Sequence, residues 1–328
     1  MRRGVIRVFL PLIVASLLLS GCGSGGGEDG DQGGGSDGGG LSIVCTTFPQ
    51  YDWVRQILGD MAGDIELTLL LKSRIDLHSY QPSIEDIAKI SSCDLFIYVG
   101  GESDEWVGDV LQGSVNPDMI AASLMEMIGY GAMPVYFVEG MQEDEDDDED
   151  ELDEHVWLSL RNAQTFCEFI TDALGYFGVE NIEAYRANLR DYTLQLETLD
   201  AQYKEVTDAA NVRTLLFGDR FPFQYLMDDY GLAAYAAFSG CSAETEASFD
   251  TIAFLTSKAD ELGLASIMVT ESSDQSIARA IINGTSSKDQ QILALDSMQS
   301  VTESDILSGA TYLTIMERNL DVLREALR

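Results

Sequence analysis

Residues 179–206 read VENIEAYRANLRDYTLQLETLDAQYKEV, and this stretch decides how the chain is organised. Its apolar and aromatic side chains recur every three or four positions, which is the spacing of one face of an α-helix. These side chains are Tyr185, Leu189, Tyr192, Leu196, Leu199 and Tyr203. No proline or glycine interrupts the stretch. We therefore predict one long, rigid helix within residues 179–210.

Strand-like and helix-like patterns alternate on both sides of this helix. Before it, strand patterns occur at residues 41–48, 65–71, 95–99 and 134–138, and helical patterns at 51–58, 84–90 and 163–177. After it, strand patterns occur at 214–217, 233–238, 266–269 and 292–295, and a helical pattern at 312–327. Such alternation predicts parallel sheets covered by helices. We expect an α/β fold with an N-terminal lobe at 41–178 and a C-terminal lobe at 211–328, joined by the long helix.

The first forty residues indicate export from the cytoplasm. Residues 1–21 have a basic start and an apolar run at 8–19 that is too short to span a bilayer, which is typical of a signal peptide. Leu19-Ser20-Gly21-Cys22 resembles the lipobox of bacterial lipoproteins, which implies cleavage before Cys22 and lipid attachment to its sulfur. An ordinary signal peptide with an incidental Cys22 is the alternative. Residues 23–40 contain eleven glycines and predict a flexible tether.

The chain is strongly acidic, with 19 basic and 56 acidic residues and a net charge of −37. Such a surface repels phosphate backbones, which excludes nucleic acid as a partner and favours cations. Eleven of the twelve residues at 143–154 are acidic, and the run ends at His155. This run either gathers cations or is a solvated stretch of charge. The four cysteines beyond Cys22 show no metal-binding spacing, so we expect buried free thiols; they are Cys45, Cys93, Cys167 and Cys241.

A small set of residues has the chemistry of a metal site. The only two histidines, His78 and His155, each lie in a loop that precedes a helical pattern. Three carboxylates, Asp219, Glu271 and Asp296, follow strand patterns of the second lobe. Ligands of open parallel sheets bind at the carboxyl ends of the strands, and carboxylates that converge there repel one another unless a cation joins them. Each carboxylate taken singly also fits a helix cap or an ion pair.

Three segments carry a family resemblance: IVCTTFPQYDWVRQILGD at 43–60, IDLHSYQPSIEDIAKISSCDLFIYVGGESDEWVGDVL at 75–111, and DEHVWLSLRNAQTFCEFITDAL at 153–174. They resemble the zinc- and manganese-type (cluster A-I) solute-binding lipoproteins of bacterial ABC transporters. The resemblance implies that His78 and His155 bind a transition metal in the cleft between the two lobes. It also implies that the loop before the second histidine, here the acidic run, collects metal.

The resemblance is less complete in the second lobe. Arg220 stands at the position of the family's third ligand, and a guanidinium cannot bind a metal. Either Asp219 takes that role, or a carboxylate from elsewhere does while Arg220 orients it. Glu244 and Glu246 are candidates for the second arrangement. The resemblance makes Asp296 the fourth ligand and places Glu271 near the cleft.

The sequence therefore predicts a function in metal uptake. Two imidazoles with carboxylates suit either Zn²⁺ or Mn²⁺. We expect a monomeric extracytoplasmic protein, lipid-anchored to the bacterial cell membrane, that captures one of these ions and delivers it to an ABC transporter permease. An enzyme is not expected, because the metalloprotease, nucleophile-elbow and P-loop motifs do not occur. The alternatives are a surface adhesion or interaction lipoprotein and, with less support, a metal-dependent hydrolase.

Overall fold

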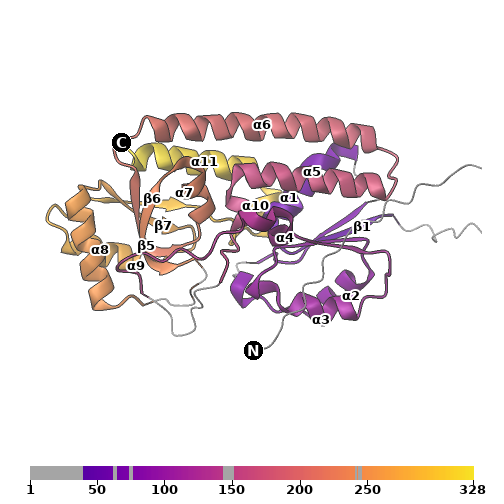
Figure 1. Ribbon diagram of the computed structural model, residues 1–328, viewed down its shortest axis with the longest axis horizontal. Coiled ribbons are helices and arrows are strands. Elements are labelled where there is room, and N and C mark those ends of the chain that lie inside the picture. Colours follow the sequence, from indigo (N-terminus) through magenta and orange to yellow (C-terminus); the bar gives the residue numbers. More distant parts are fainter. Residues whose placement is uncertain (1–39, 62–64, 74–76, 143–150, 241, 243–245) are drawn as a thin grey trace, which may run out of the picture. The chain divides into compact units, whose positions relative to one another are not determined.

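The computed structural model describes residues 40–61, 65–73, 77–142, 151–240, 242 and 246–328 (Figure 1). The predicted signal peptide, Cys22, the tether up to residue 39, most of the acidic run, Cys241 and Glu244 lie outside these ranges. Within them, no helix has the length and apolar character required to cross a bilayer.

The N-terminal lobe contains a four-stranded sheet in which all pairings are parallel. The order is β2-β1-β3-β4, with bounds β1 Ser42–Cys45, β2 Glu66–Leu69, β3 Leu95–Tyr98 and β4 Ile120–Ser123. The central strands β1 and β3 are almost wholly buried, as expected of a parallel sheet covered on both faces. The strands predicted at 41–48, 65–71 and 95–99 are confirmed.

The strand predicted at 134–138 is wrong, and β4 takes the fourth place in the sheet. Residues 134–138 are rich in β-branched and aromatic side chains, but they make only one isolated antiparallel bridge, between Pro134 and Leu152. Tyr136 instead packs on Phe221 of the second lobe, with ring centroids 5.6 Å apart. The sequence of β4, Ile-Ala-Ala-Ser, has weak strand propensity, so its partner β3 is what makes it a strand.

Helices cover this sheet, and short loops follow its strands at the carboxyl edge. The helical bounds are α1 Phe48–Leu58, α2 Ile84–Ser92, α3 Trp106–Gln112, α4 Leu124–Ile128 and α5 Leu160–Tyr176. The single 3₁₀ turns are η1 Gly59–Met61, η2 Leu77–Ser79, η3 Glu102–Asp104, η4 Gly129–Gly131 and η5 Val156–Leu158. The first residue after each of the strands β1 and β3 is buried, so the loops there begin inside the lobe. Three described cysteines are buried free thiols, as predicted: Cys45, Cys93 and Cys167.

The C-terminal lobe repeats this architecture with the order β6-β5-β7-β8, again all parallel. The strands are β5 Thr214–Phe221, β6 Ala233–Ser239, β7 Ser266–Thr270 and β8 Gln291–Leu295, and the helices are α7 Gln224–Tyr230, α8 Phe249–Leu262, α9 Ser276–Gly284, α10 Glu303–Leu307 and α11 Tyr312–Ala326. All four predicted strands are confirmed. The register of pairing between β5 and β6 shifts between Phe217 and Arg220. The strand β5 continues beyond residue 217, its predicted end, to Phe221.

The long helix predicted at 179–210 is α6, which extends over Ile182–Asp208 and lies beside α5, α1 and α11 (Figure 1). Five residues of its predicted stripe are buried: Tyr185, Tyr192, Leu196, Leu199 and Tyr203. The helix α11 adds a second connection, because the backbone N–H of Tyr312 donates to Asp52 of α1 at 2.8 Å. The Tyr312 ring also packs edge-on against Trp53, with centroids 5.2 Å apart. Two helices therefore tie the lobes together.

Candidate metal centre

His78 and His155 lie side by side although they come from different loops. His78 belongs to η2, and His155 precedes η5. Their ring centroids are 5.4 Å apart and the rings are tilted by 55°. The side chain of His78 is 17% exposed, and His155 is fully buried. The two histidines that the resemblance assigns to one metal ion therefore lie next to each other.

The ring of His155 is oriented from both ends. Asp153 accepts hydrogen bonds from the backbone N–H of His155 at 2.8 Å and from its Nδ1 at 2.9 Å. On the other side of the ring, Gln299 Nε2 lies 3.2 Å from His155 Nε2. A carboxylate accepts and an amide NH₂ donates, so both contacts require that the imidazole proton is on Nδ1. The Nε2 lone pair of His155 therefore faces the second lobe.

The ring of His78 also meets polar groups at Nδ1. The Ser103 hydroxyl lies 2.6 Å from His78 Nδ1, and Glu154 Oε2 lies 3.7 Å from the same atom. Ser103 is held in turn, because its backbone N–H donates to Glu154 Oε1 at 2.9 Å. Burial raises the pKa of Glu154 to about 7, although hydrogen bonds from Ser103 lower it in part.

The end of the acidic run is therefore structural. Asp153 and Glu154 are 2% and 1% exposed, and each lies beside one histidine. A solvated stretch of charge does not describe these two residues. Residues 143–150, the denser part of the run, lie outside the described ranges.

Asp219 lies within β5 rather than after it, because the strand extends to Phe221. Its Oδ2 accepts from the backbone N–H and the hydroxyl of Thr270 at 3.1 and 2.8 Å. Its Oδ1 accepts from the backbone N–H of Arg220 at 2.8 Å. Asp219 thus joins β5 to β7, and each of its oxygens already accepts at least one hydrogen bond.

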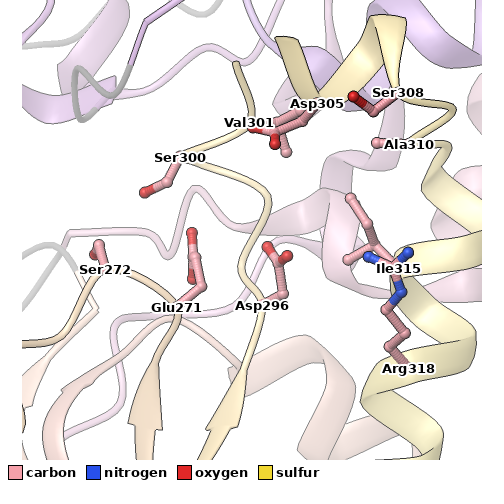
Figure 2. A pocket seen from close by; sticks show the side chains of 10 residues that line it. All are labelled: Glu271, Ser272, Asp296, Ser300, Val301, Asp305, Ser308, Ala310, Ile315 and Arg318. Atoms are coloured by element: carbon pink, nitrogen blue, oxygen red, sulfur yellow. The ribbon is translucent and has the colours of Figure 1, made fainter. Parts of the chain in front are cut away.

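Glu271 and Asp296 follow β7 and β8 and line a pocket of about 290 Å³, where Figure 2 shows both carboxylates at the strand ends. Glu271 accepts from the backbone N–H of Ser297 at 2.9 Å and from its hydroxyl at 3.0 Å. Burial and the neighbouring charge of Glu271 raise the pKa of Asp296 to about 6. The predicted delivery of both carboxylates to the edge of the sheet is confirmed.

Arg220 lines a smaller neighbouring pocket of about 180 Å³, together with Gln299. Its Nη1 donates to the backbone carbonyl of Ser242 at 3.4 Å. Glu246 is exposed, and Glu244 lies outside the described residues. Among the residues that the structure describes, no three His, Cys, Asp or Glu side chains are grouped closely enough to enclose a metal ion.

Sequence reasoning missed four residues of this centre: Ser103, Asp153, Glu154 and Gln299. Asp153 could have been suspected, because an acid two residues before a histidine can accept from both its N–H groups. The other three carry no local signal. Ser103 and Gln299 reach the histidines only because the chain folds back over 25 and 144 positions.

A family model described as zinc-uptake complex component A, periplasmic, matches residues 43–326. The chain is 30% identical over 293 residues to the zinc-binding lipoprotein AdcA of Streptococcus pneumoniae, an alignment that covers 88% of this chain and 56% of AdcA. The chain thus spans about half the length of the AdcA proteins that it matches. It is also 27% identical over 318 residues to the high-affinity zinc uptake system protein ZnuA of Bacillus subtilis, covering 95% of this chain and 94% of that protein.

Solved structures agree with the sequence matches. The Zn(II)-bound ZnuA-like domain of Streptococcus pneumoniae AdcA is similar with a TM-score of 0.69 and 28% identity, over 88% of this chain and 99% of that domain. The metal-dependent lipoprotein YcdH of Bacillus subtilis is similar with a TM-score of 0.71 and 26% identity, over 88% and 100%. The two lobes, the paired histidines and these matches lead to one conclusion: the chain belongs to the zinc-uptake complex component A family of metal-binding (cluster A-I) solute-binding proteins.

Proposed function

We propose that this protein captures a zinc ion outside the cytoplasm and delivers it to the permease of an ABC transporter. The observation that supports this most directly is the approach of His78 and His155, whose ring centroids lie 5.4 Å apart. Metal–nitrogen bonds are about 2 Å long, so two rings at this separation can donate to one ion after a small adjustment. Each ring has polar partners at Nδ1, as metal-binding histidines commonly do.

The remaining ligands in this proposal come from the second lobe. Asp296 is the carboxylate that we favour, because it is half-buried at the end of β8. Its pKa is raised by burial and by the neighbouring charge of Glu271, which a cation would offset. Asp219 stays in the proposed set, although its hydrogen bonds to Thr270 and Arg220 leave it fewer lone pairs. Glu244 and Glu246 remain alternatives to Asp219 as the third ligand, with Arg220 orienting that carboxylate, and Glu271 is proposed to lie near the ion without binding it.

Zinc is favoured over manganese as the captured ion. The similar proteins named above carry the words zinc-binding or zinc uptake in their names. A pair of imidazoles also suits zinc, whereas manganese prefers a site richer in oxygen. We propose zinc as transported cargo and not as a catalytic cofactor, because a carrier must hold the ion and release it unchanged.

The location of the protein follows from its N-terminal sequence and from the family. The family model is described as periplasmic, and AdcA is named a lipoprotein. We propose that Cys22 carries a lipid that anchors a monomeric protein to the outer surface of the cell membrane. Residues 23–40 would then act as a tether between the anchor and the two lobes.

Calorimetric titration of metal-free protein with Zn²⁺ and Mn²⁺, together with elemental analysis, tests the proposal. We expect one tight zinc site per chain, weaker manganese binding, and no tight site in the His78→Ala/His155→Ala double variant. Zinc should also raise the unfolding temperature, since a ligand at 100 times its Kd stabilises by about 2.7 kcal/mol. Equal binding by the wild type and the double variant would refute the proposed site.

A further inference from the structure

Ser103, which is half-buried, and Glu154, which is buried, lie beside Nδ1 of His78 and are not among the proposed zinc ligands. Ser103 Oγ lies 2.6 Å from His78 Nδ1, and the Ser103 backbone N–H donates to Glu154 Oε1 at 2.9 Å. The second oxygen, Glu154 Oε2, lies 3.7 Å from His78 Nδ1 and has no hydrogen-bond partner among the described residues. The inference below rests on the proposed function and concerns how the site is prepared for the ion.

The backbone is shaped to admit the Glu154 side chain. Gly101 has a φ of +85°, a backbone conformation that residues other than glycine rarely adopt. A Cβ atom at this position would lie 2.3 Å from Glu154 Oε1 and 2.8 Å from its Cγ and Cδ atoms. Only glycine therefore lets the carboxylate reach the Ser103 backbone. The Glu154 carboxylate, which is buried and accepts from the Ser103 backbone N–H, therefore has a fixed position beside His78.

The chemistry of the three groups assigns the proton on the His78 ring. His78 Nδ1 faces both the Ser103 oxygen, at 2.6 Å, and Glu154 Oε2, at 3.7 Å, and this buried carboxyl oxygen has no hydrogen-bond partner among the described residues. A proton on Nδ1 can be donated to the Ser103 oxygen and lies beside the carboxyl oxygen, whereas a lone pair on Nδ1 would face that buried oxygen with a second acceptor. The Glu154 oxygen beside Nδ1 favours the same arrangement, because it attracts an N–H and repels a nitrogen lone pair at that atom.

We propose that Ser103 and Glu154 are positioning residues, which keep the ring proton of His78 on Nδ1 so that Nε2 offers its lone pair to the zinc ion. Asp153, the residue before Glu154, does the same for His155. Two consecutive acids at the end of the acidic run thus prepare the two histidines for one ion. Both rings then present the nitrogen that lies farther from the backbone.

The tautomers can be read directly, because the chain has only two histidines. Long-range ¹H–¹⁵N spectra of metal-free protein labelled with ¹⁵N-histidine distinguish a proton on Nδ1 from one on Nε2. In the wild type we expect both rings to carry the proton on Nδ1. In Glu154→Gln and in Ser103→Ala, His78 should become a mixture of tautomers while the His155 signals stay unchanged. A His78 proton on Nε2 in the wild type would overturn the inference.

Zinc affinity provides the second readout. Loss of the partner that orients a metal-binding histidine typically weakens binding by about 10–100-fold, and we expect this for Glu154→Gln and Ser103→Ala. Glu102→Gln is the matched control, since it removes an exposed carboxylate from the same loop and should leave tautomers and affinity unchanged. Unchanged tautomers and affinity in both test variants would refute the positioning role. If the wild type binds no zinc, the proposed function fails, and the tautomer spectra still decide the role of Ser103 and Glu154. If Glu154→Gln does not fold, Ser103→Ala carries the test, because it removes one oxygen from a half-buried side chain.

Discussion

The rings of His78 and His155 lie 5.4 Å apart, centroid to centroid, and each has a buried acid near its Nδ1 atom. The two acids, Glu154 and Asp153, are adjacent in sequence. This relationship connects the acidic run to the histidines by direct contact rather than by long-range attraction alone.

Replacing either histidine by alanine should remove tight zinc binding. We expect His78→Ala and His155→Ala to weaken zinc binding by about 100-fold or more, which corresponds to about 2.8 kcal/mol. His155→Ala should also lower the unfolding temperature, because His155 is fully buried and its loss leaves a cavity and removes the ring hydrogen bond to Asp153. Titration calorimetry and circular dichroism measure the two effects. A variant that keeps wild-type affinity would exclude that histidine as a ligand.

Asp153→Asn should weaken zinc binding by about tenfold or more, because a neutral amide accepts from Nδ1–H more weakly than a carboxylate and can also donate through its NH₂ group. The shape of the side chain is nearly unchanged, so we expect a small effect on stability. Asp118→Asn is a suitable control, since Asp118 is exposed in the same lobe. Equal affinity of Asp153→Asn and the control would show that Asp153 is not needed to orient the ring.

Neutralising residues 143–150, by exchange of each Glu for Gln and each Asp for Asn, should slow zinc association at low salt and change the equilibrium affinity little. Charge outside the site attracts cations over a Debye length of about 8 Å at physiological salt. Asp153 and Glu154 must be retained, since a deletion that reaches Asp153 would combine capture with the orientation of His155. Stopped-flow kinetics with a zinc indicator measure the rate. An unchanged rate at low salt would favour a solvated stretch of charge.

Asp104 should make the stability of the protein depend on pH. Burial raises the pKa of its carboxyl to about 6, although it accepts from the backbone N–H of Gly100 at 2.9 Å. Because the pKa of Asp104 is higher in the folded than in the unfolded protein, the protonated carboxyl favours the folded state. Its contribution to the free energy of unfolding is complete below about pH 4 and is lost as pH rises through about 6.

Asp104→Asn should therefore gain stability relative to the wild type by about 2–3 kcal/mol between pH 4 and pH 8. Urea unfolding at each pH, without metal, gives this difference. Asp109→Asn, an exposed neighbour in α3, should show none. A pH-independent difference between Asp104→Asn and wild type would contradict the raised pKa.

Closure around the ion should be small. Both α6 and α11 connect the lobes, and the contact of Tyr312 with Asp52 and Trp53 is buried. Long helices resist bending, so we expect movement to be concentrated in the loops around the site. Small-angle scattering with and without zinc should give nearly equal radii of gyration. A large compaction on zinc addition would show that the helices bend or slide.

The sequence by itself determined the larger features of this protein. The stripe of α6, the alternation of strands and helices and the two histidines are local signals, because periodicity and residue type report burial and chemistry without knowledge of the fold. Only at residues 134–138 did this reasoning place a strand wrongly, where propensity favoured a strand but the pairing partner was absent. The strand β4 has the opposite character, since Ala121 and Ala122 become strand residues only through β3.

Only the tertiary structure decided how the centre is built. Ser103 and Gln299 carry no sequence signal, because a hydroxyl or an amide becomes a partner of a histidine only when distant segments meet. The sequence placed Asp219 at the end of a strand with a free carboxylate. In the structure β5 continues beyond Asp219 after a register shift, and the Thr270 hydroxyl donates to its carboxylate. Residue types determine which hydrogen bonds and metal contacts a side chain can make. Which of these contacts form depends on distances below about 4 Å, and between remote segments such distances arise only from packing.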